Sequence, residues 1–250
     1  MIDIHTHILP GLDDGAEDIY DSLEMGFMAQ EHGTKVIVAT PHCNIPGLYS
    51  NYFGEHYKDV FLKTRKAFER EGLTIKLLPG MEVFATYDLP RLVKEGRIMT
   101  LNRTSYILVE FDFGEDPEFA EDVLLRLEEI KLRPVIAHAE RYEFIQDNPE
   151  IAGDWKKRGY VIQANKGSFI GRFGKGARNT AYRLMNDRAI EVIASDAHRP
   201  YRRTTDMEDT YRLLAGDYPE EYMKHLFYEN PGIICRGRLL NQDRKKRVII

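Results

Sequence analysis

The chain has 250 residues, of which 43% are hydrophobic and 30% are charged. These are ordinary values for a globular protein, and they exclude intrinsic disorder and collagen-like sequence. With 35 Lys and Arg against 40 Asp and Glu, the formal net charge is −5, which predicts no nucleic-acid partner and no general attraction to anionic membranes.

Strand-like and helix-like segments alternate along the whole chain. In chain order, strands are predicted at Ile2–Ile4, Val36–Ala39, Lys76–Leu78, Tyr106–Val109, Pro134–Ala137, Tyr160–Gln163 and Ile190–Ala194. Helices are predicted at Tyr20–Glu31, Glu55–Arg70, Leu89–Glu95, Pro117–Ile130, Pro149–Lys157, Lys175–Asn186, Met207–Leu214 and Pro219–Glu229. Because no linker or shift in composition interrupts these units, we predict a single domain over residues 1–250.

Strands separated by helices form a parallel sheet with right-handed crossovers. Such a sheet either stays open or closes into a barrel. An open dinucleotide-binding sheet has a glycine-rich turn after its first strand, whereas this turn reads HILPGLDDGA. We therefore predict an α/β fold, a barrel with fewer than eight strands, and chemistry at the carboxyl ends of the strands.

The cellular context is predicted from the cysteines and the N-terminus. Two cysteines are too few for a disulfide framework or a Cys-rich zinc site. The segment MIDIHTH lacks the regions of a signal peptide, and no apolar run reaches the about 18 residues of a membrane span. These features predict a cytoplasmic protein with reduced thiols and no membrane insertion.

Six of the seven predicted strands end in side chains that can bind a metal ion. His5 and His7 are two residues apart, so in an extended strand they point to one face, about 6–7 Å apart. Imidazole and carboxylate ligands without thiolate suit Mn, Fe or Zn. The sequence therefore predicts a site for two or three metal ions, with the ligands His5, His7, His42, Glu82, Glu110, His138, Asp196 and His198.

Such a metal centre supplies hydroxide at neutral pH, which can hydrolyse phosphate esters, amides or lactams. Basic residues near the strand ends narrow the substrate class, because Arg binds phosphate oxygens in a bidentate manner. These residues could simply be solvated side chains of loops, but as a cluster we expect them to bind a phosphate group. Its members are Arg141, Lys166, Arg172, Lys175, Arg178, Arg199, Arg202 and Arg203.

The cysteines test a rival mechanism. Thiol-based tyrosine phosphatases resemble one another in having Cys, five residues and then Arg. The same interval leads from Cys43 to Tyr49 and from Cys235 to Asn241, so neither cysteine fits. We predict that both thiols are buried and inert.

The motifs MIDIHTHILPGLDDGA, TPHCN, GMEVF, LVEFDF, PVIAHAERY, QANKGSF and SDAH occur in this order along the chain. Together they resemble the polymerase and histidinol phosphatase (PHP) superfamily, and within it the bacterial manganese-dependent protein-tyrosine phosphatases of capsule and exopolysaccharide biosynthesis systems. The resemblance implies a distorted seven-stranded (β/α) TIM-like barrel with three metals at its rim, held by the eight residues above. It also implies that Arg141 and Arg203 contact phosphate, although Arg202 could replace Arg203.

The substrate implied by the resemblance is phosphotyrosine on a tyrosine autokinase that controls polysaccharide polymerisation. In the expected reaction a metal-bound hydroxide attacks phosphorus, Arg141 and Arg203 hold the phosphate oxygens, and a metal or His42 assists the departing phenolate. The alternatives are a small-metabolite phosphoesterase resembling histidinol phosphatase, a nuclease, and, more remotely, a non-catalytic metal-binding regulator. The sequence leaves open the oligomeric state, the metal loaded in the cell, and the role of the basic segment 236–247.

Overall fold

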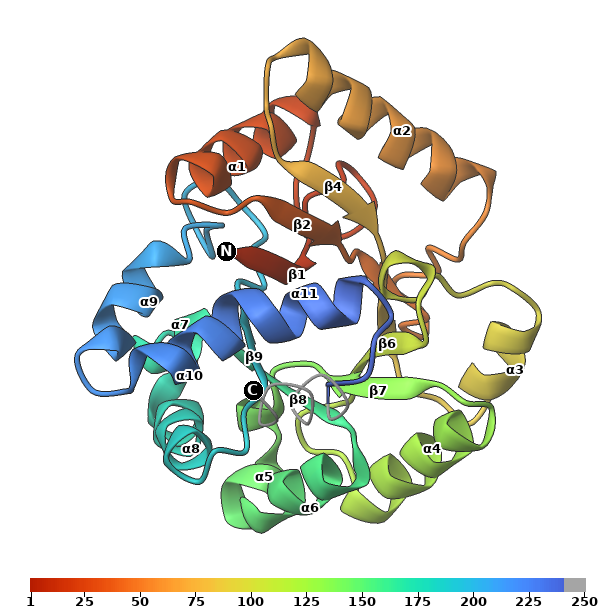
Figure 1. The fold of residues 1–250 in the computed structure, drawn as a ribbon. Helices are drawn as coiled ribbons and strands as arrows, with labels where there is room; N and C mark the ends of the chain where they lie inside the picture. The colour runs from red at the N-terminus through yellow and green to blue at the C-terminus, as the bar shows by residue number, and fades with distance from the viewer. Residues whose placement is uncertain (241–250) are drawn as a thin grey trace.

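The computed structural model describes residues 1–240, which form nine short strands in two parallel sheets (Figure 1). The smaller sheet has the order β1-β2-β4, formed by Ile2–Thr6, Val36–Ala39 and Lys76–Pro79. The larger sheet has the order β3-β5-β6-β7-β8-β9, formed by His42–Cys43, Glu82–Phe84, Tyr106–Glu110, Arg133–Ile136, Val161–Asn165 and Val192–Ala194.

The two sheets curl so that the last strand returns to the first. The amide of Asp196 donates to the carbonyl of His5 at 2.9 Å, and the amide of His7 donates to Ala197 at 2.8 Å. A parallel bridge joins Thr6 and Ala197. These contacts produce the curled parallel sheet of an α/β fold, as the alternation of strands and helices predicted.

Helices cover the outer face of the curled sheet (Figure 1). Short 3-10 turns lie at Leu101–Arg103 (η1) and Ala139–Arg141 (η2). The helices up to β9 are α1 Ile19–Glu31, α2 Glu55–Arg70, α3 Leu89–Lys94, α4 Pro117–Glu129, α5 Glu143–Asp147, α6 Glu150–Arg158, α7 Lys166–Phe169 and α8 Gly174–Asn186. After β9 come α9 Glu208–Ala215, α10 Glu220–Lys224, the π-helical turn η3 His225–Glu229 and α11 Asn230–Cys235.

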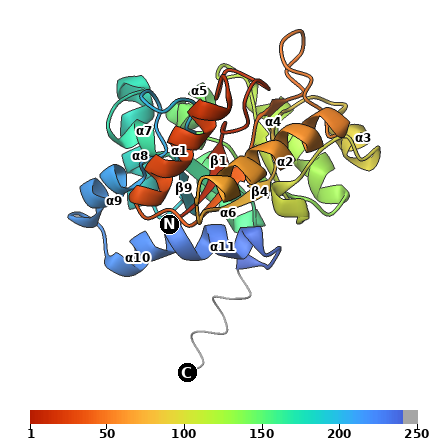
Figure 2. The ribbon, with the colours of Figure 1, turned by 90° about the horizontal axis from the view of Figure 1, so that it is seen from above.

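The apolar side chains of the strands form two clusters, because successive residues point to opposite faces of a sheet. The outer cluster packs under the helices and includes Ile37 and Ile107. The inner cluster lies within the curl and includes Ile4 and Leu108. It also contains Ile234 of α11, so this helix closes the amino-terminal end of the curl, on the side where the chain begins (Figures 1 and 2).

Helix α11 is one difference from the predicted elements, because the last helix was expected to end at Glu229. Pro231 lacks an amide donor and clashes with the preceding helical turn, which normally stops a helix. Here a π-helical turn at His225–Glu229 precedes Pro231, and the wider turn lets the helix continue. The strands β3 and β5 were also missed, because runs of two and three residues show no measurable periodicity.

No helix formed by residues 1–240 combines the length and the apolar character needed to cross a bilayer. The basic segment 236–247 lies mostly outside the described residues. Within the described part, the carbonyl of Arg238 accepts a hydrogen bond from the Tyr106 hydroxyl at 2.9 Å, which fixes the chain beside β6.

Candidate metal centre

Strand β1 brings two imidazoles to the carboxyl end of the curled sheet. Between Asp3 and Thr6 it has one residue more than its partner β2, which is the signature of a β-bulge. A bulge changes the direction of nearby side chains and is common beside active sites. Here the Nε2 atoms of His5 and His7 converge to 3.3 Å, so both rings face one point.

His5 and His7 form a buried group with two carboxylates. Ligand atoms of His5, His7 and Asp196 all lie within 4.8 Å of one another. Glu82 joins them, with its Oε1 atom 3.1 Å from His5 Nε2 and its Oε2 atom 3.2 Å from His7 Nε2. Four side chains from β1, β5 and the end of β9 can therefore surround one cation.

Two further groups overlap the first. His42, Glu82 and Glu110 form one of them, and His138 Nε2 lies 2.9 Å from Glu82 and 3.4 Å from Glu110. The other consists of His7, Asp14, His42 and His198. Because Glu82 and His42 each approach more than one group, the arrangement has the geometry for several neighbouring ions. The structure thus brings all eight predicted ligand residues together.

Several nitrogen and oxygen atoms in these groups lack a hydrogen-bond partner in the described part of the protein. Within residues 1–240, His42 Nδ1, Glu82 Oε2, Glu110 Oε2 and His198 Nε2 are buried without a hydrogen-bond partner. His42 Nδ1 lies 3.0 Å from Glu82 Oε2, yet their directions do not form a hydrogen bond. Buried polar atoms are nearly always partnered, so lone pairs that converge in this way suit divalent cations.

The carboxylates of the site stay ionised despite their burial. Burial opposes the charge of Glu82, but the facing His5 and His42 hold the pKa of its carboxyl well below the usual range. Burial also opposes the charge of Asp196, whose pKa is held well below the usual range by His5 and Arg203. Ionised oxygens are the form that binds metal ions.

Side chains outside the three groups orient the imidazoles. Asp13 Oδ2 lies 2.7 Å from His7 Nδ1 and also accepts the amide of His42 at 2.7 Å. Gln163 Oε1 lies 3.1 Å from His5 Nδ1. Contacts of this kind set the tautomer and direction of a ligating histidine, so Nε2 of His5 and of His7 is left to face the centre.

Sequence reasoning missed Asp13, Asp14 and Gln163, although LDDGA contained a usable signal. A Cβ atom on Gly15 would lie 2.2 Å from the carbonyl oxygen of His7, so only glycine allows this approach. The close approach brings Asp13 back onto the His7 ring and places Asp14 Oδ1 3.4 Å from His198 Nε2. Gln163 carried no signal of its own, because its contacts with His5 and with the amide of His138 join segments distant in the sequence.

Two of the predicted arginines lie beside Asp196. Arg203 forms an ion pair with this carboxylate, and an Arg141 nitrogen lies 3.8 Å from it. The Arg141 guanidinium is stacked between the rings of Phe113 and Phe173, at 4.1 and 4.2 Å from their centroids. Arg202 is exposed, so the geometry favours Arg203 as the second cation of the site.

Comparison with known sequences identifies the family. The family described as capsular polysaccharide synthesis, CpsB/CapC, matches residues 1–236. The chain belongs to the CpsB/CapC family. This membership confirms the narrower of the two resemblances seen in the sequence.

Relatives of this CpsB/CapC protein cover nearly its whole length. The tyrosine-protein phosphatase YwqE of Bacillus subtilis is 33% identical over 240 residues, which are 96% of this chain and 93% of YwqE. The tyrosine-protein phosphatase CpsB of Streptococcus pneumoniae is 28% identical over 245 residues, which are 96% of this chain and 100% of CpsB.

Solved structures agree with the fold. A structure from work on YwqE and CpsB, described there as unique metal-dependent tyrosine phosphatases, superposes with a TM-score of 0.88 at 34% identity and 95% coverage of both chains. HisK from Listeria monocytogenes, studied as a candidate histidinol phosphatase, has a TM-score of 0.53 at 16% identity, covering 85% of this chain and 98% of HisK. The second likeness supports the PHP-like fold alone.

Some predicted cations of this CpsB/CapC protein are engaged elsewhere. Lys166 is buried and pairs with Asp209 at 3.2 Å, although it was expected in the cationic cluster. Arg199 pairs with Glu17 at 2.6 Å, at the loop before α1. Each was predicted from its place after a strand, but carboxylates distant in the sequence determine where these side chains point.

The thiols have the inert character that the sequence predicted. Cys43 and Cys235 are free and buried. The Cys43 thiol donates to the carbonyl of Ser50 at 3.2 Å, and burial raises its pKa to about 12. A nucleophilic cysteine needs a lowered pKa, so Cys43 lacks the chemistry for a thiol-based route even though it lies next to His42.

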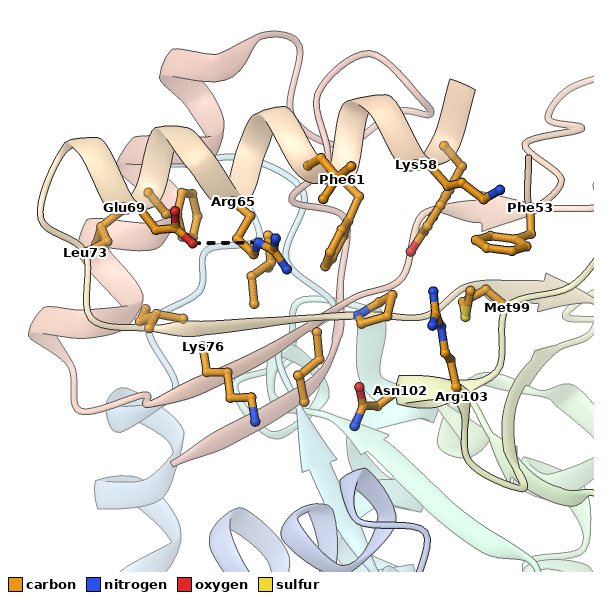
Figure 3. A pocket seen from close by; sticks show the side chains of 17 residues that line it. Phe53, Lys58, Phe61, Arg65, Glu69, Leu73, Lys76, Met99, Asn102 and Arg103 are labelled. Carbon is orange, nitrogen blue, oxygen red and sulfur yellow. Dashed lines mark ion pairs between the residues drawn. The ribbon is translucent and has the colours of Figure 1, made fainter. Parts of the chain in front are cut away.

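A separate cavity of 570 Å³ lies between α2 and β4 (Figure 3). Apolar side chains such as Phe61 and Met99 line it, and Lys58, Lys76 and Arg103 add positive charge (Figure 3). Among the described residues, none of the eight predicted ligands lines this cavity. The convergent polar groups of a reaction centre therefore lie elsewhere, at the carboxyl ends of the strands.

Proposed function

We propose that this protein is a metal-dependent protein-tyrosine phosphatase that hydrolyses phosphotyrosine on a tyrosine autokinase and so regulates capsular or exopolysaccharide synthesis. One observation carries the proposal: three overlapping groups of imidazoles and carboxylates lie directly beside Arg141 and Arg203. The choice of substrate is supported by the membership of the protein in the CpsB/CapC family and by its relatives named as tyrosine phosphatases.

We assign the metal ligands to His5, His7, His42, Glu82, Glu110, His138, Asp196 and His198, and we add the half-exposed Asp14 as a further candidate. We expect two or three Mn²⁺ ions, with Fe or Zn as alternatives that the same donor types accept. Divalent ions bound there would lower the pKa of a water molecule and offset the negative charge of the phosphate.

The arginines bind and orient the phosphate group. Asp196 holds both guanidinium groups near the centre, and the rings of Phe113 and Phe173 keep Arg141 in a fixed plane. A planar guanidinium in a fixed orientation can form two parallel hydrogen bonds to phosphate oxygens. The buried Arg203 Nε has no hydrogen-bond partner among the described residues, which leaves this donor available.

We also retain a role for His42 in departure of the phenolate, which requires one ring nitrogen that no metal occupies. A phenol has a pKa near 10, so its anion needs less help from a proton donor than an alkoxide does. An aryl phosphate ester therefore suits a site in which His42 is the candidate proton donor to the leaving group.

We further propose that the curled sheet is a seven-stranded barrel. We count β2 with β3, and β4 with β5, as two bent strands, because each pair is separated by only two residues. With this count we propose a distorted seven-stranded (β/α) barrel, formed as a single domain by the residues that the structure describes. The free thiols of Cys43 and Cys235 suit a reducing, cytoplasmic environment.

The direct test combines metal analysis of the purified protein with turnover of a phosphotyrosine peptide before and after chelation. We expect bound metal, loss of turnover with EDTA, and recovery when Mn²⁺ is added. Histidinol phosphate and single-stranded DNA, assayed in parallel, cover the metabolite and nuclease alternatives. Faster turnover of either one would contradict the proposal, as would metal-dependent kinase binding without any hydrolysis.

The arginine assignment is tested by matched variants. Arg141→Ala and Arg203→Ala should each lower kcat/KM on the peptide by about 100-fold, because each loses a charged contact to the transferring phosphate. Arg202→Ala, a neighbouring exposed arginine, should change it by less than about twofold. A loss of less than about threefold in Arg141→Ala would show that this arginine does not hold the phosphate.

A further inference from the structure

A hollow of 210 Å³ opens directly beside the candidate metal centre. Its polar side includes His42 and Glu110, both assigned above as ligands, together with the carboxylates of Asp14 and Asp112. The opposite sides are formed by Leu48, Tyr49 and Phe113, from two loops that are distant in the sequence. The polar side chains of the metal centre thus adjoin a small cleft whose other walls are apolar.

One wall of the cleft comes from the loop between β3 and α2. Leu48 at its tip is 67% exposed, so its side chain is open to a ligand on this side. The next residue, Tyr49, stacks on the His42 ring with the two planes 3° apart and the centroids at 5.8 Å. The apolar wall therefore begins at a ring of the metal centre.

This loop is held in place by hydrogen bonds at its base. The amide of Ile45 donates to the carbonyl of Tyr49 at 2.9 Å, and the Asn51 side chain donates to the carbonyl of His42 at 2.9 Å. The Asn44 side chain donates to the carbonyl of Phe84 at 2.9 Å. The loop projects from the body on the side opposite α11 (Figure 2), so the wall is preformed and accessible.

Phe113, which follows β6, forms the other wall. Its side chain is 37% exposed, and the Arg141 guanidinium stacks on its ring at 4.1 Å. The same aromatic ring thus borders both the cation that holds phosphate and the apolar cleft. A phosphate bound between Arg141 and the metal centre would place its ester substituent next to Phe113.

We infer that this cleft binds the aromatic ring of the substrate, with Leu48 and Tyr49 on one side and Phe113 on the other. The inference rests on the proposed phosphatase function and adds the residues that discriminate aryl from alkyl phosphate esters. An aromatic ring gains free energy from apolar burial and from edge or offset contacts with other rings. The short side chain of a phosphoserine would leave the cleft unfilled.

Two phosphonates test the cleft without turnover. Benzylphosphonate and methylphosphonate have the same anionic group, but only the first has a ring. Calorimetric titration of the Mn²⁺-loaded protein should show that benzylphosphonate binds at least about tenfold more tightly. Leu48→Ser and Tyr49→Ala should each reduce this ratio by about three- to tenfold, while the affinity for methylphosphonate changes by less than about twofold.

A matched control is Leu62→Ser, the same substitution at a leucine of α2 that is 43% exposed and lines the cavity of Figure 3. It should leave the ratio unchanged. Tyr49→Phe, which keeps the ring, should retain the wild-type ratio and thereby separate packing from hydrogen bonding. These two variants show whether the effect belongs to the cleft.

Equal affinities of the wild-type protein for the two phosphonates would overturn the inference. So would an equal loss of both affinities in the Leu48 and Tyr49 variants, because these residues would then shape the metal centre instead. Failure of the proposed function looks different: the Mn²⁺-loaded protein would not hydrolyse a phosphotyrosine peptide at all, whatever the ratio of the phosphonates.

Discussion

The two ends of the curled sheet are built from the same strands but differ in the polarity of the side chains that they bury. At the amino-terminal end, Ile4 and Leu108 pack with Ile234 of α11 in a closed apolar cluster. At the carboxyl end, His5 and Glu82 belong to groups of buried polar side chains whose lone pairs converge. In β1 the change occurs within one residue, from Ile4 to His5.

This difference separates stability from chemistry. Apolar burial at the amino-terminal end, which α11 closes, stabilises the fold. At the carboxyl end, buried polar atoms without partners destabilise the fold unless a cation is bound. Because both ends belong to one sheet, the stability gained at the amino-terminal end can offset the cost of the unpartnered polar atoms at the carboxyl end. Three variants and one chemical modification test this division of roles, in order of expected effect.

The largest effect is expected at Glu82, which approaches more than one group of ligands. Glu82→Gln removes the charge but keeps the size, so it should lower kcat/KM on a phosphotyrosine peptide by about 1000-fold and reduce the bound Mn²⁺. Activity and metal content are measured on the same sample. Glu69→Gln, at the exposed edge of the α2–β4 cavity, is the control, and normal metal content in Glu82→Gln would contradict the assignment.

A smaller effect is expected at Asp13, which orients His7 from outside the three groups. Asp13→Asn should weaken Mn²⁺ binding by about 10- to 100-fold, because the ring loses its fixed tautomer and direction. Titration of the metal-free protein measures the loss, and saturating Mn²⁺ should restore most of the activity. An unchanged affinity would show that His7 needs no such support.

At the closed end, Ile234→Ala should lower stability with little change in chemistry. Removing these buried methyl groups leaves a cavity and should lower the free energy of unfolding by about 2–4 kcal/mol. Urea unfolding measures this loss, and kcat/KM at low temperature should stay within about twofold of wild type. A large loss of activity without a change in stability would break the comparison.

The smallest effect is expected at Cys43, which lies beside the site but takes no part in it. Because burial raises the pKa of its thiol to about 12, iodoacetamide at neutral pH should leave the activity unchanged. The measurement is turnover before and after treatment, with thiol labelling followed by mass spectrometry. Rapid labelling with loss of turnover would show that Cys43 is accessible and reactive.

Local signals predicted most of the fold. Strands such as Val36–Ala39 and helices such as Glu55–Arg70 have the bounds that their periodicity indicated. Prediction failed where the elements are too short for a period, as in β3, or where a wider helical turn lets the chain continue through Pro231. Both failures arise from pairing or packing that no single window of sequence contains.

The amino-acid sequence by itself determined the types of ligand and their position at strand ends, because the carboxyl ends of parallel strands meet at one edge. It therefore indicated His5 and Asp196 as neighbours, although they are far apart in the chain. Only the tertiary structure decided that Arg203 rather than Arg202 approaches Asp196, and that Tyr49 and Phe113 face one cleft. These choices depend on the directions of loops, which are set by contacts between distant segments and leave no periodic trace in the sequence.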